Sequence, residues 1–268
     1  MTAARHVVVA GAFDDIRSCD LRFLEEAARL GAVTVLLSSD AAIREATGRP
    51  SQFSFAERQY LLAAVRHVSR IVAGGPEAEY LPEDVAGGTW AGREGEASQA
   101  RQRFCQEHGL SYRVIPDDAL LGFPEQTRVQ TSRKRVVVTG CYDWFHSGHV
   151  RFFEEASSYG DLYVVVGHDA NIRRLKGEGH PLLPAQERRY MVGTIRTVTQ
   201  ALVSSGDGWL DAEPEIRRLQ PDFYVVNEDG DKGGKREFCR ANGIEYIVLR
   251  RIPAPGLPKR SSTDLRGF

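Results

Sequence analysis

Two histidines separated by Ser147 and Gly148 are the side chains of this chain best suited to chemistry on a phosphate. His146 and His149 lie between an apolar run, residues 136–142, and a run of helical spacing, so we expect them at a helix N-terminus. Such a terminus offers free N–H groups and a partial positive charge to an anion, and Gly148 allows close approach to the backbone. The pattern therefore favours a site for a phosphate chain. Two alternatives remain, because histidines at this spacing could bind a metal or simply pack against the sheet.

The segment around these histidines occurs twice. GCYDWFHSGHVRFFEEA spans residues 140–156 and GAFDDIRSCDLRFLEEA spans residues 11–27. Further along, these segments match in the same order: 40–68 with 169–198, and 101–115 with 235–249. A repeat of this extent predicts two similar domains in tandem, residues 1–130 and 131–268, joined at the polar stretch 127–135.

Both halves show the pattern of an α/β protein. Short β-branched apolar runs, expected to be buried strands, alternate with amphipathic runs, expected to be helices closed by glycine in two cases. The predicted strands are residues 7–13, 33–39, 136–142, 162–168, 223–227 and 244–249, and the predicted helices are residues 21–31, 57–68, 150–160 and 187–198. This alternation predicts two tandem Rossmann-like domains, each with a parallel sheet.

The composition excludes several classes of protein. Hydrophobic residues make up 42% and charged residues 26% of the 268 residues, as in globular proteins, and a net charge of −1 disfavours polymeric nucleic acid as a partner. No apolar run is long enough to span a membrane, and the N-terminal sequence lacks the pattern of a signal peptide, so we expect a cytoplasmic protein. The cysteines are scattered without a CxxC pair and are expected to be reduced: Cys19, Cys105, Cys141 and Cys239.

The histidine segment and its surroundings resemble the cytidylyltransferase-like nucleotidyltransferases. GCYDWFHSGH resembles the family's GxFDxxHxGH signature, and RSSTDLR, residues 260–266, resembles its serine/threonine-rich signature near the C-terminus. Between them, Lys176 and Arg188 resemble the family's substrate-phosphate lysine and its helix-borne arginine. The resemblance covers residues 134–268. It implies an enzyme that joins a nucleoside triphosphate to a small phosphomonoester and releases pyrophosphate.

The resemblance also implies roles for individual residues. His146 and His149 would stabilise charge on the α-phosphate, and Lys176 would hold the incoming phosphate. The implied nucleotide-binding residues are Gly140, Cys141, Tyr142, Asp143, Gly148, Arg188, Asn227, Asp229, Ser261, Ser262 and Thr263. Some have simpler explanations: the hydroxyls could be an ordinary helix N-cap, and Arg188 could form a salt bridge, since Arg58 occupies its matching place. Mg²⁺ is expected with the triphosphate, without a dedicated protein site.

The first half departs from the signature at each landmark. Arg17, Cys19 and Asp20 replace His146, Gly148 and His149. Thr47 stands at the lysine position, and Thr127-Arg128-Val129 stand in place of the serine/threonine signature. Because Asp20 would repel a triphosphate, we expect the first half to be non-catalytic. It would support the second half as an internal pseudo-dimer, in a chain that is a monomer or pairs again as a homodimer. A rival role is to bind a regulator.

The functional hypotheses differ in the nucleotide. The tandem arrangement resembles the ethanolamine-phosphate cytidylyltransferases, which favours CTP and a phosphorylated alcohol, polyol or sugar as acceptor. The first alternative is an adenylyltransferase that uses ATP, and the second is a non-enzymatic nucleotide-binding protein. A dehydrogenase is disfavoured because no GxGxxG follows the first strand of either half, and a class I aminoacyl-tRNA synthetase is disfavoured by the lack of a KMSKS-like loop.

Overall fold

The computed structural model describes residues 6–75, 81–82, 85–125 and 131–265, with the backbone alone for residues 263–264. The chain forms two compact units, unit 1 (Met1–Gly122) and unit 2 (Phe123–Phe268). The predicted boundary after residue 130 adjoins residues 126–130, which lie outside the described residues, as do Thr127, Arg128 and Val129. How the units sit relative to one another is not described, so the internal pseudo-dimer stays a prediction.

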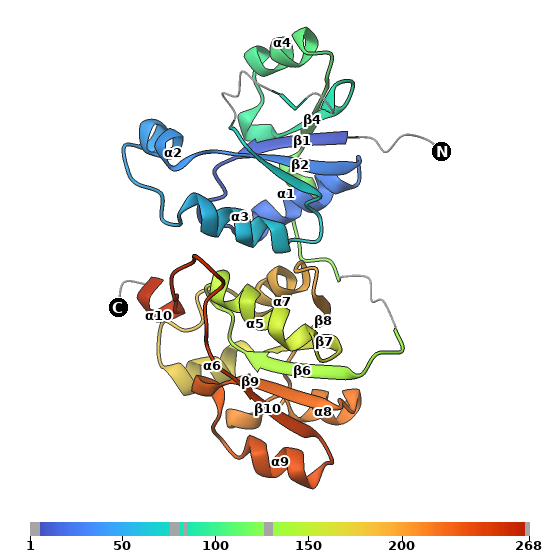
Figure 1. Cartoon of the computed structure of the whole chain (residues 1–268), viewed down its shortest axis with the longest axis vertical. Coiled ribbons are helices and arrows are strands. Elements are labelled where there is room, and N and C mark those ends of the chain that lie inside the picture. The colour runs from blue at the N-terminus through green and yellow to red at the C-terminus, as the bar shows by residue number, and fades with distance from the viewer. Residues whose placement is uncertain (1–5, 76–80, 83–84, 126–130, 266–268) are drawn as a thin grey trace. The chain divides into compact units, whose positions relative to one another are not determined.

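Unit 2 contains a five-stranded sheet in the order β10-β9-β6-β7-β8, with every neighbouring pair parallel (Figure 1). Its strands are β6 (Arg135–Gly140), β7 (Asp161–Val166), β8 (Val198–Val203), β9 (Phe223–Asn227) and β10 (Glu245–Leu249). Its α-helices are α5 (Ser147–Ser157), α6 (Asp169–Lys176), α7 (Ala185–Gly193), α8 (Glu213–Leu219), α9 (Lys235–Ala241) and α10 (Ser262–Leu265). From β6 the chain adds β7 and β8 on one side and then β9 and β10 on the other side. Sheets of this type bind ligands at the point where the strand order reverses, here between β6 and β9.

Unit 1 repeats the topology, with the parallel order β3-β2-β1-β4-β5. Its strands are β1 (His6–Gly11), β2 (Ala32–Leu37), β3 (Arg70–Ala73), β4 (Thr89–Arg93) and β5 (Ser111–Ile115). Its α-helices in the described residues are α1 (Ser18–Ala28), α2 (Asp40–Thr47), α3 (Phe55–Ala64) and α4 (Gln99–Glu107). The predicted fold class, two Rossmann-like parallel sheets, is confirmed.

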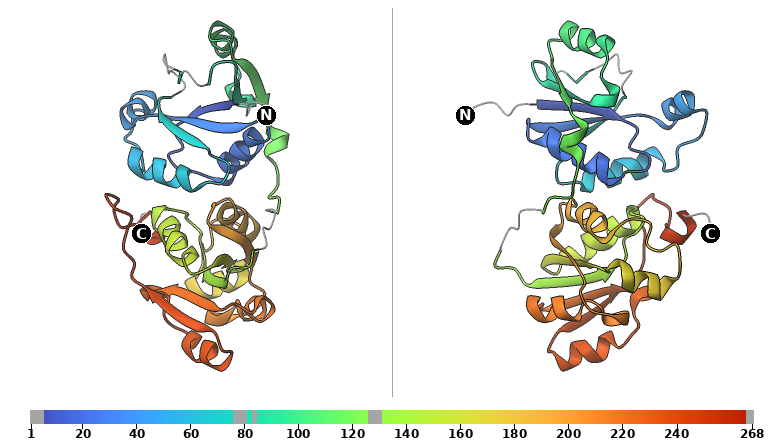
Figure 2. Two further views of the ribbon diagram at one scale, coloured as in Figure 1. Left: turned by 45° about the vertical axis from the view of Figure 1, so that its right-hand side comes forward. Right: turned by 180° about the vertical axis from the view of Figure 1, so that it is seen from behind.

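Burial on both faces explains why the strands inside each sheet, such as β2 and β7, are largely apolar. In unit 2, Val137, Tyr163 and Tyr224 lie on one face and pack against Ile216 of α8 and Cys239 of α9. The other face is covered by α5 and α7, and Figure 2 shows helices on both faces of each sheet. A strand buried on both faces needs apolar residues at every position, so the alternating pattern of a half-buried strand is absent.

The long predicted helix 187–198 is shorter than expected. Helix α7 ends at Gly193, and the segment from Val198 joins the sheet as β8. Thr194 caps the helix, since its hydroxyl donates to the carbonyl of Met191 at 2.7 Å. Gly193 and the β-branched residues after it have lower helix propensity than the residues before them. Ile195 and Val198, just before and at the start of β8, are instead buried.

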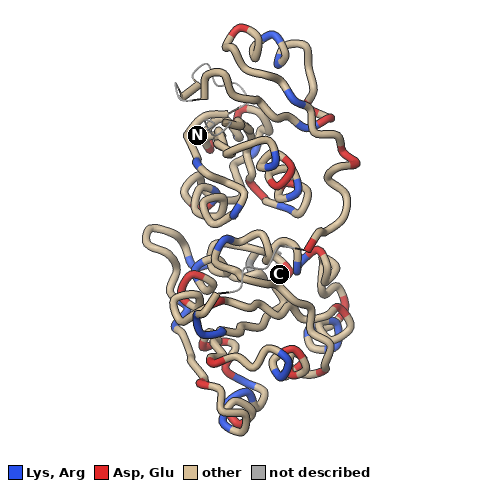
Figure 3. The backbone as a smooth tube through the Cα atoms, turned by 90° about the vertical axis from the view of Figure 1, so that its right-hand side faces the viewer, with Lys and Arg blue, Asp and Glu red and all other residues tan. Residues whose placement is uncertain are grey.

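The surface carries both signs of charge. Figure 3 shows lysine and arginine interspersed with aspartate and glutamate along the chain. Among the helices of the described residues, none combines the length and the apolar character needed to cross a bilayer.

Candidate active site

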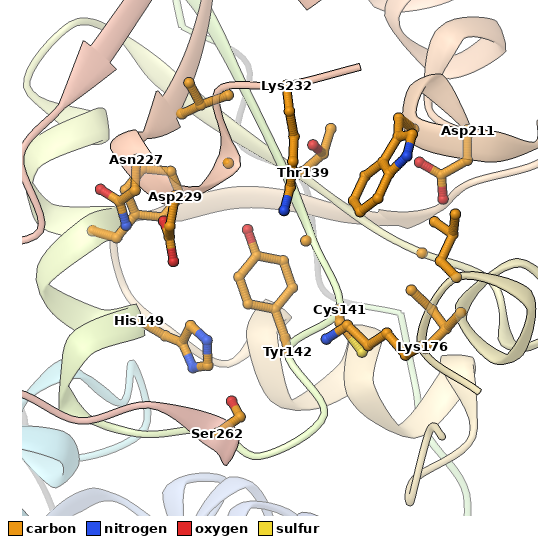
Figure 4. A pocket seen from close by; sticks show the side chains of 18 of the residues that line it. Thr139, Cys141, Tyr142, His149, Lys176, Asp211, Asn227, Asp229, Lys232 and Ser262 are labelled. Atoms are coloured by element: carbon orange, nitrogen blue, oxygen red, sulfur yellow. The ribbon is translucent and has the colours of Figure 1, made fainter. Parts of the chain in front are cut away.

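A cavity of about 380 Å³ opens in unit 2 at the carboxyl ends of β6, β7 and β9 (Figure 4). Most of the predicted site residues line it: Gly140, Cys141, Tyr142, His146, Gly148, His149, Lys176, Asn227, Asp229, Ser261 and Ser262. Asp143 and Arg188 do not line it, and the side chain of Thr263 lies outside the described residues. The fold thus brings segments from both ends of unit 2 to the point between β6 and β9 where the strand order reverses.

The two histidines form a stacked pair at the start of α5. Their ring centroids lie 3.9 Å apart with an interplanar angle of 23°. The Nδ1 atom of His146 accepts from the backbone N–H of Gly148 at 3.1 Å, and the Nδ1 atom of His149 accepts from the backbone N–H of His146 at 3.4 Å. In each neutral ring the proton therefore lies on Nε2, which makes Nε2 a hydrogen-bond donor.

Gly148 is required by this stacking. A Cβ atom at this position would lie 3.0 Å from the His146 ring, which is tighter than an ordinary contact. It would also lie 3.7 Å from the carbonyl oxygen of Arg260, so the C-terminal segment approaches the start of α5 closely here. The glycine lets both the histidine ring and the serine-bearing segment, residues 260–262, come near the helix N-terminus.

His149 is held in its neutral form. Burial lowers its pKa well below the ordinary value, and the positive charges of His146, Arg251 and Lys176 act in the same direction. A neutral imidazole keeps Nδ1 as an acceptor and Nε2–H as a donor at neutral pH. The ring can then donate to an anionic oxygen without carrying a charge of its own.

This depressed pKa predicts how stability depends on pH. Below a pH of about 6.5 the unfolded chain protonates His149 while the folded chain does not, so the free energy of unfolding should fall as the pH drops. Urea unfolding of the wild type and of His149→Asn at pH 7.5 and pH 5.5 measures this. The wild type should lose more stability than the variant between the two pH values. An equal loss of stability in the two proteins would contradict the lowered pKa of His149. Burial also lowers the pKa of His67, but this effect is the same in the wild type and in the variant.

The serine-bearing segment is fixed beside the histidines. Arg251 donates to the carbonyl of Arg260 at 2.7 Å and to Asp229 at 2.8 Å, which ties the end of unit 2 to the loop after β9. The hydroxyl of Ser262 donates to the carbonyl of Trp144 at 3.3 Å. The hydroxyl-bearing start of α10 therefore faces the same cavity as the histidine pair, as Figure 4 shows for Ser262 and His149.

Asp143 and Arg188 make internal contacts typical of scaffold residues, and nucleotide binding by them stays a prediction. Asp143 is buried and accepts from the backbone N–H groups of Leu182 and Leu183 at 2.7 and 3.0 Å. Arg188 is fully buried, and its guanidinium donates to Asp169 at 2.6 Å and to three backbone carbonyls, those of Leu183, Cys141 and Gly167. With four of its donor contacts made inside the protein, Arg188 has little capacity left for a phosphate.

Unit 1 keeps the same scaffold. Arg58 is buried and donates to Asp40 at 2.7 Å and to the carbonyl oxygens of Phe53 and Ala12. Asp14 accepts from the backbone N–H of Phe53, as Asp143 does from the matching loop. These contacts are common to a half with the histidines and a half without them, so they serve the fold.

At the start of α1, acidic and basic side chains of unit 1 satisfy one another. Asp20, which matches His149, accepts from the backbone N–H of Arg17 at 2.7 Å and pairs with Arg93 at 2.6 Å. Arg17, which matches His146, pairs with Asp15 at 2.5 Å. The guanidinium of Arg93 also lies 4.6 Å from the Phe23 ring centroid. The place that the histidine pair occupies in unit 2 is therefore filled by internal ion pairs.

The structure adds residues that sequence reasoning missed. They come from the loops after β8 and β9, from α6, from the start of α9 and from the segment after β10: Asn171, Trp209, Asp211, Lys232, Lys235 and Arg251. The strand β8 was not predicted, so the loop after it could not be placed. Lys232 and Lys235 follow the predicted strand 223–227, and their closeness to Asn227 was the available signal.

Metal ligands are sparse at this site. In the part of the chain that the structure describes, no group of three or more histidine, cysteine, aspartate or glutamate residues is placed to hold a metal ion. Asp229 already pairs with Arg251, and Asp211 accepts from the hydroxyl of Ser204 at 2.8 Å. Such a donor set fits an ion that is held mainly by phosphate oxygens.

Comparisons with known proteins identify a family for unit 2. The family described as cytidylyltransferase-like matches residues 137–268. FAD synthase from Aciduliprofundum boonei (strain DSM 19572 / T469) is 35% identical over 136 residues, which cover 50% of this chain and 84% of that protein. The chain belongs to the cytidylyltransferase-like family. The resemblance expected from the histidine and serine signatures is thus confirmed.

Other matches are to longer or more distant proteins. Bifunctional protein HldE from Shewanella piezotolerans (strain WP3 / JCM 13877) is 36% identical over 139 residues, and the match covers 50% of this chain but only 28% of that protein. Among solved structures, a lipopolysaccharide core biosynthesis protein from Thermoplasma volcanium GSS1 matches 45% of this chain and 98% of its own at 22% identity, with a TM-score of 0.38. A likeness at that level supports no conclusion about function.

Proposed function

We propose that unit 2 transfers a nucleotidyl group from a nucleoside triphosphate to a small phosphomonoester and releases pyrophosphate. The observation that carries this proposal is the stacked pair of His146 and His149. Both Nδ1 atoms accept backbone hydrogen bonds, and both rings line a cavity that Ser261, Ser262 and Lys176 also line. This arrangement gathers donors for phosphate oxygens at a helix N-terminus. Membership of the family supports the same reaction class.

The chemistry assigned to the histidines is stabilisation of developing charge. An oxygen of the acceptor phosphate attacks the α-phosphorus in line, and the bond from the α-phosphorus to the bridging oxygen of pyrophosphate breaks. Nε2–H groups of His146 and His149 donate to the α-phosphate oxygens as negative charge builds on them. Ser261 and Ser262 donate to the β- and γ-phosphates, which leave as pyrophosphate. Fixed donors need no reorientation during the reaction, which is why the tight packing of the pair matters.

Lys176 is assigned to the acceptor phosphate. It is the last residue of α6, is exposed, lines the cavity and lies near Cys141 and His149. Burial raises the pKa of Cys141 and lowers that of His149; the charge of Lys176 opposes the first shift and adds to the second. A flexible ammonium there offsets the repulsion between the incoming phosphate and the triphosphate. Mg²⁺ would enter with the triphosphate, neutralise its charge and be held mainly by phosphate oxygens.

The nucleotide has two candidates. The tandem repeat favoured CTP, by its resemblance to ethanolamine-phosphate cytidylyltransferases. ATP is favoured by the curated relative of which this chain covers 84%, because that relative is named FAD synthase and so makes an adenine dinucleotide. Since that match extends over most of the relative, we take ATP as the first nucleotide to test.

Unit 1 is assigned no catalysis. The ion pairs of Asp20 with Arg93 and of Arg17 with Asp15 occupy the place of the histidine pair, and a carboxylate there repels a triphosphate. Its proposed role is structural support of unit 2.

Pyrophosphate release tests the reaction. The intact chain is incubated with Mg²⁺, one nucleoside triphosphate and a set of small phosphomonoesters, including sugar phosphates, polyol phosphates and FMN. We expect pyrophosphate and a nucleotidylated acceptor in equal amounts, detected by mass spectrometry. Pyrophosphate formed without any nucleotidylated acceptor, or none formed across the whole set with all four triphosphates, would contradict the proposal.

A further inference from the structure

The cavity extends beyond the histidines to a second region that the proposed reaction does not use. Lys232 and Lys235 line this region from the loop after β9 and the start of α9, and Trp209 lines it from the loop after β8. In Figure 4, Lys232 enters the pocket from the side opposite to His149 and Ser262, with Tyr142 between them. The region is therefore distinct from the end that we assign to the triphosphate.

Lys235 is buried without an ionic partner. Its side chain is 8% exposed, and its ammonium donates to the backbone carbonyl of Gly230 at 3.0 Å. Among the described residues, no carboxylate lies within salt-bridge distance of it. Burial lowers the pKa of Lys235; the charges of Asp211, Asp231 and Asp229 oppose this shift, and that of Lys232 adds to it. Since none of these carboxylates forms a salt bridge with the ammonium, its direct contact with an anionic group is left for a ligand.

Tyr142 adds a donor that the fold does not require. It is 5% exposed, and within the described part of the chain its hydroxyl has no hydrogen-bond partner although it is buried. The hydroxyl end of Tyr142 faces the part of the pocket that Lys232 enters (Figure 4). In unit 1 the matching residue is Phe13, which adopts the same left-handed backbone conformation, with φ of 46° against 53° for Tyr142. The aromatic ring thus suffices for the fold, and the hydroxyl is left for a ligand.

Trp209 supplies a flat wall beside the lysines. It is 48% exposed, and the ammonium of Lys232 lies 4.7 Å from its ring centroid. Gly233 fixes this wall, because a Cβ atom there would lie 2.2 Å from the Cβ of Trp209. The two loops therefore meet closely, and the carbon skeleton of a small ligand can rest on the indole while its anionic end reaches the lysines.

Resting on the proposed function, we propose that the acceptor is a small phosphomonoester with a second anionic group, a carboxylate or another phosphate. Its reacting phosphate lies at Lys176. The second anionic group accepts hydrogen bonds from Lys232, Lys235 and the Tyr142 hydroxyl. This feature distinguishes the acceptor from glycerol phosphate, which carries no second anion, and from phosphoethanolamine, whose second group is cationic.

Calorimetric binding of matched probes to the intact chain tests this proposal. The pairs are 3-phosphoglycerate with glycerol 3-phosphate, O-phosphoserine with phosphoethanolamine, and fructose 1,6-bisphosphate with fructose 6-phosphate. Within at least one pair, the probe with the additional anion should bind about tenfold more tightly, the effect of one charge-assisted hydrogen bond. The first two pairs report on a carboxylate and the third on a phosphate.

Two substitutions assign the effect to this region. Lys232→Gln and Tyr142→Phe should each reduce the preference, while Lys134→Gln should keep it. Lys134 is a matched control: it is exposed and lies 4.7 Å from the ring centroid of Phe223, as Lys232 does from Trp209, but does not line the cavity. Equal binding within all three pairs, which includes no binding of either member, would overturn the proposal, as would a preference that persists in Lys232→Gln. Pyrophosphate release with a singly anionic acceptor would refute this inference and leave the proposed function standing.

Discussion

Replacing His149 with alanine should lower the rate of nucleotidyl transfer by about two orders of magnitude or more, as loss of a transition-state donor does elsewhere. The substitution removes one Nε2–H donor and leaves His146 without its stacking partner at 3.9 Å. The measurement is the steady-state rate of pyrophosphate release at saturating nucleotide with the acceptor that gives product. The loss should appear in kcat, because the donor acts most strongly when charge builds on the α-phosphate.

Asp20→Ala in unit 1 is the matched control for His149→Ala. It changes the equivalent position of the repeat and breaks the ion pair with Arg93, but Asp20 is not one of the residues that line the cavity in unit 2. We expect its kcat to stay within about twofold of the wild type, since typical surface substitutions change little. Comparable losses in both variants would contradict the assignment of catalysis to unit 2 alone.

Replacing Arg188 with methionine should lower the free energy of unfolding by about 3 kcal/mol or more, since each buried acceptor left without a donor costs about 1–3 kcal/mol. The substitution leaves Asp169 and the carbonyls of Leu183, Cys141 and Gly167 without the donors that now satisfy them. Urea unfolding followed by a signal from unit 2 measures the loss. The buried place of the side chain makes this the largest stability effect we expect at a single position.

The control for Arg188→Met is Arg173→Met on α6, whose side chain is exposed. That variant should change the free energy of unfolding by no more than about 0.5 kcal/mol. If Arg188→Met instead unfolded like the wild type but lost its stabilisation by nucleotide, Arg188 would be a ligand-binding residue and not a scaffold residue.

The fold could be predicted because its signals are local. Runs such as VVVTG and LYVVV are short, β-branched and bounded by glycine, and such runs alternate with amphipathic helices in both halves. Helix ends were less accurate, as at Gly193, because the choice between continuing α7 and starting β8 depends on burial in the sheet.

The site could be predicted where one segment contains both the chemistry and its support. The histidines, Gly148 and the helix N-terminus lie within a few residues of each other, so their spacing alone indicated a phosphate site. Lys232, Trp209 and Arg251 reach the cavity from separate loops, and their positions depend on the order of strands in the sheet. Arg188 was predicted to bind nucleotide because an arginine near a phosphate site resembles a ligand. Its repeat in unit 1, Arg58, was the signal for the alternative of a salt bridge, which the structure contains.

The most direct test of the central claim is thermal unfolding with each of ATP, CTP, GTP and UTP in the presence of Mg²⁺. The wild type, His149→Ala and Asp20→Ala are compared. A ligand at 100 times its Kd stabilises the folded state by about 2.7 kcal/mol, which shifts the melting temperature measurably. We predict a shift with ATP or CTP in the wild type and in Asp20→Ala, and its loss in His149→Ala. No shift with any triphosphate, or an undiminished shift in His149→Ala, would contradict a nucleotide site built on the histidine pair of unit 2.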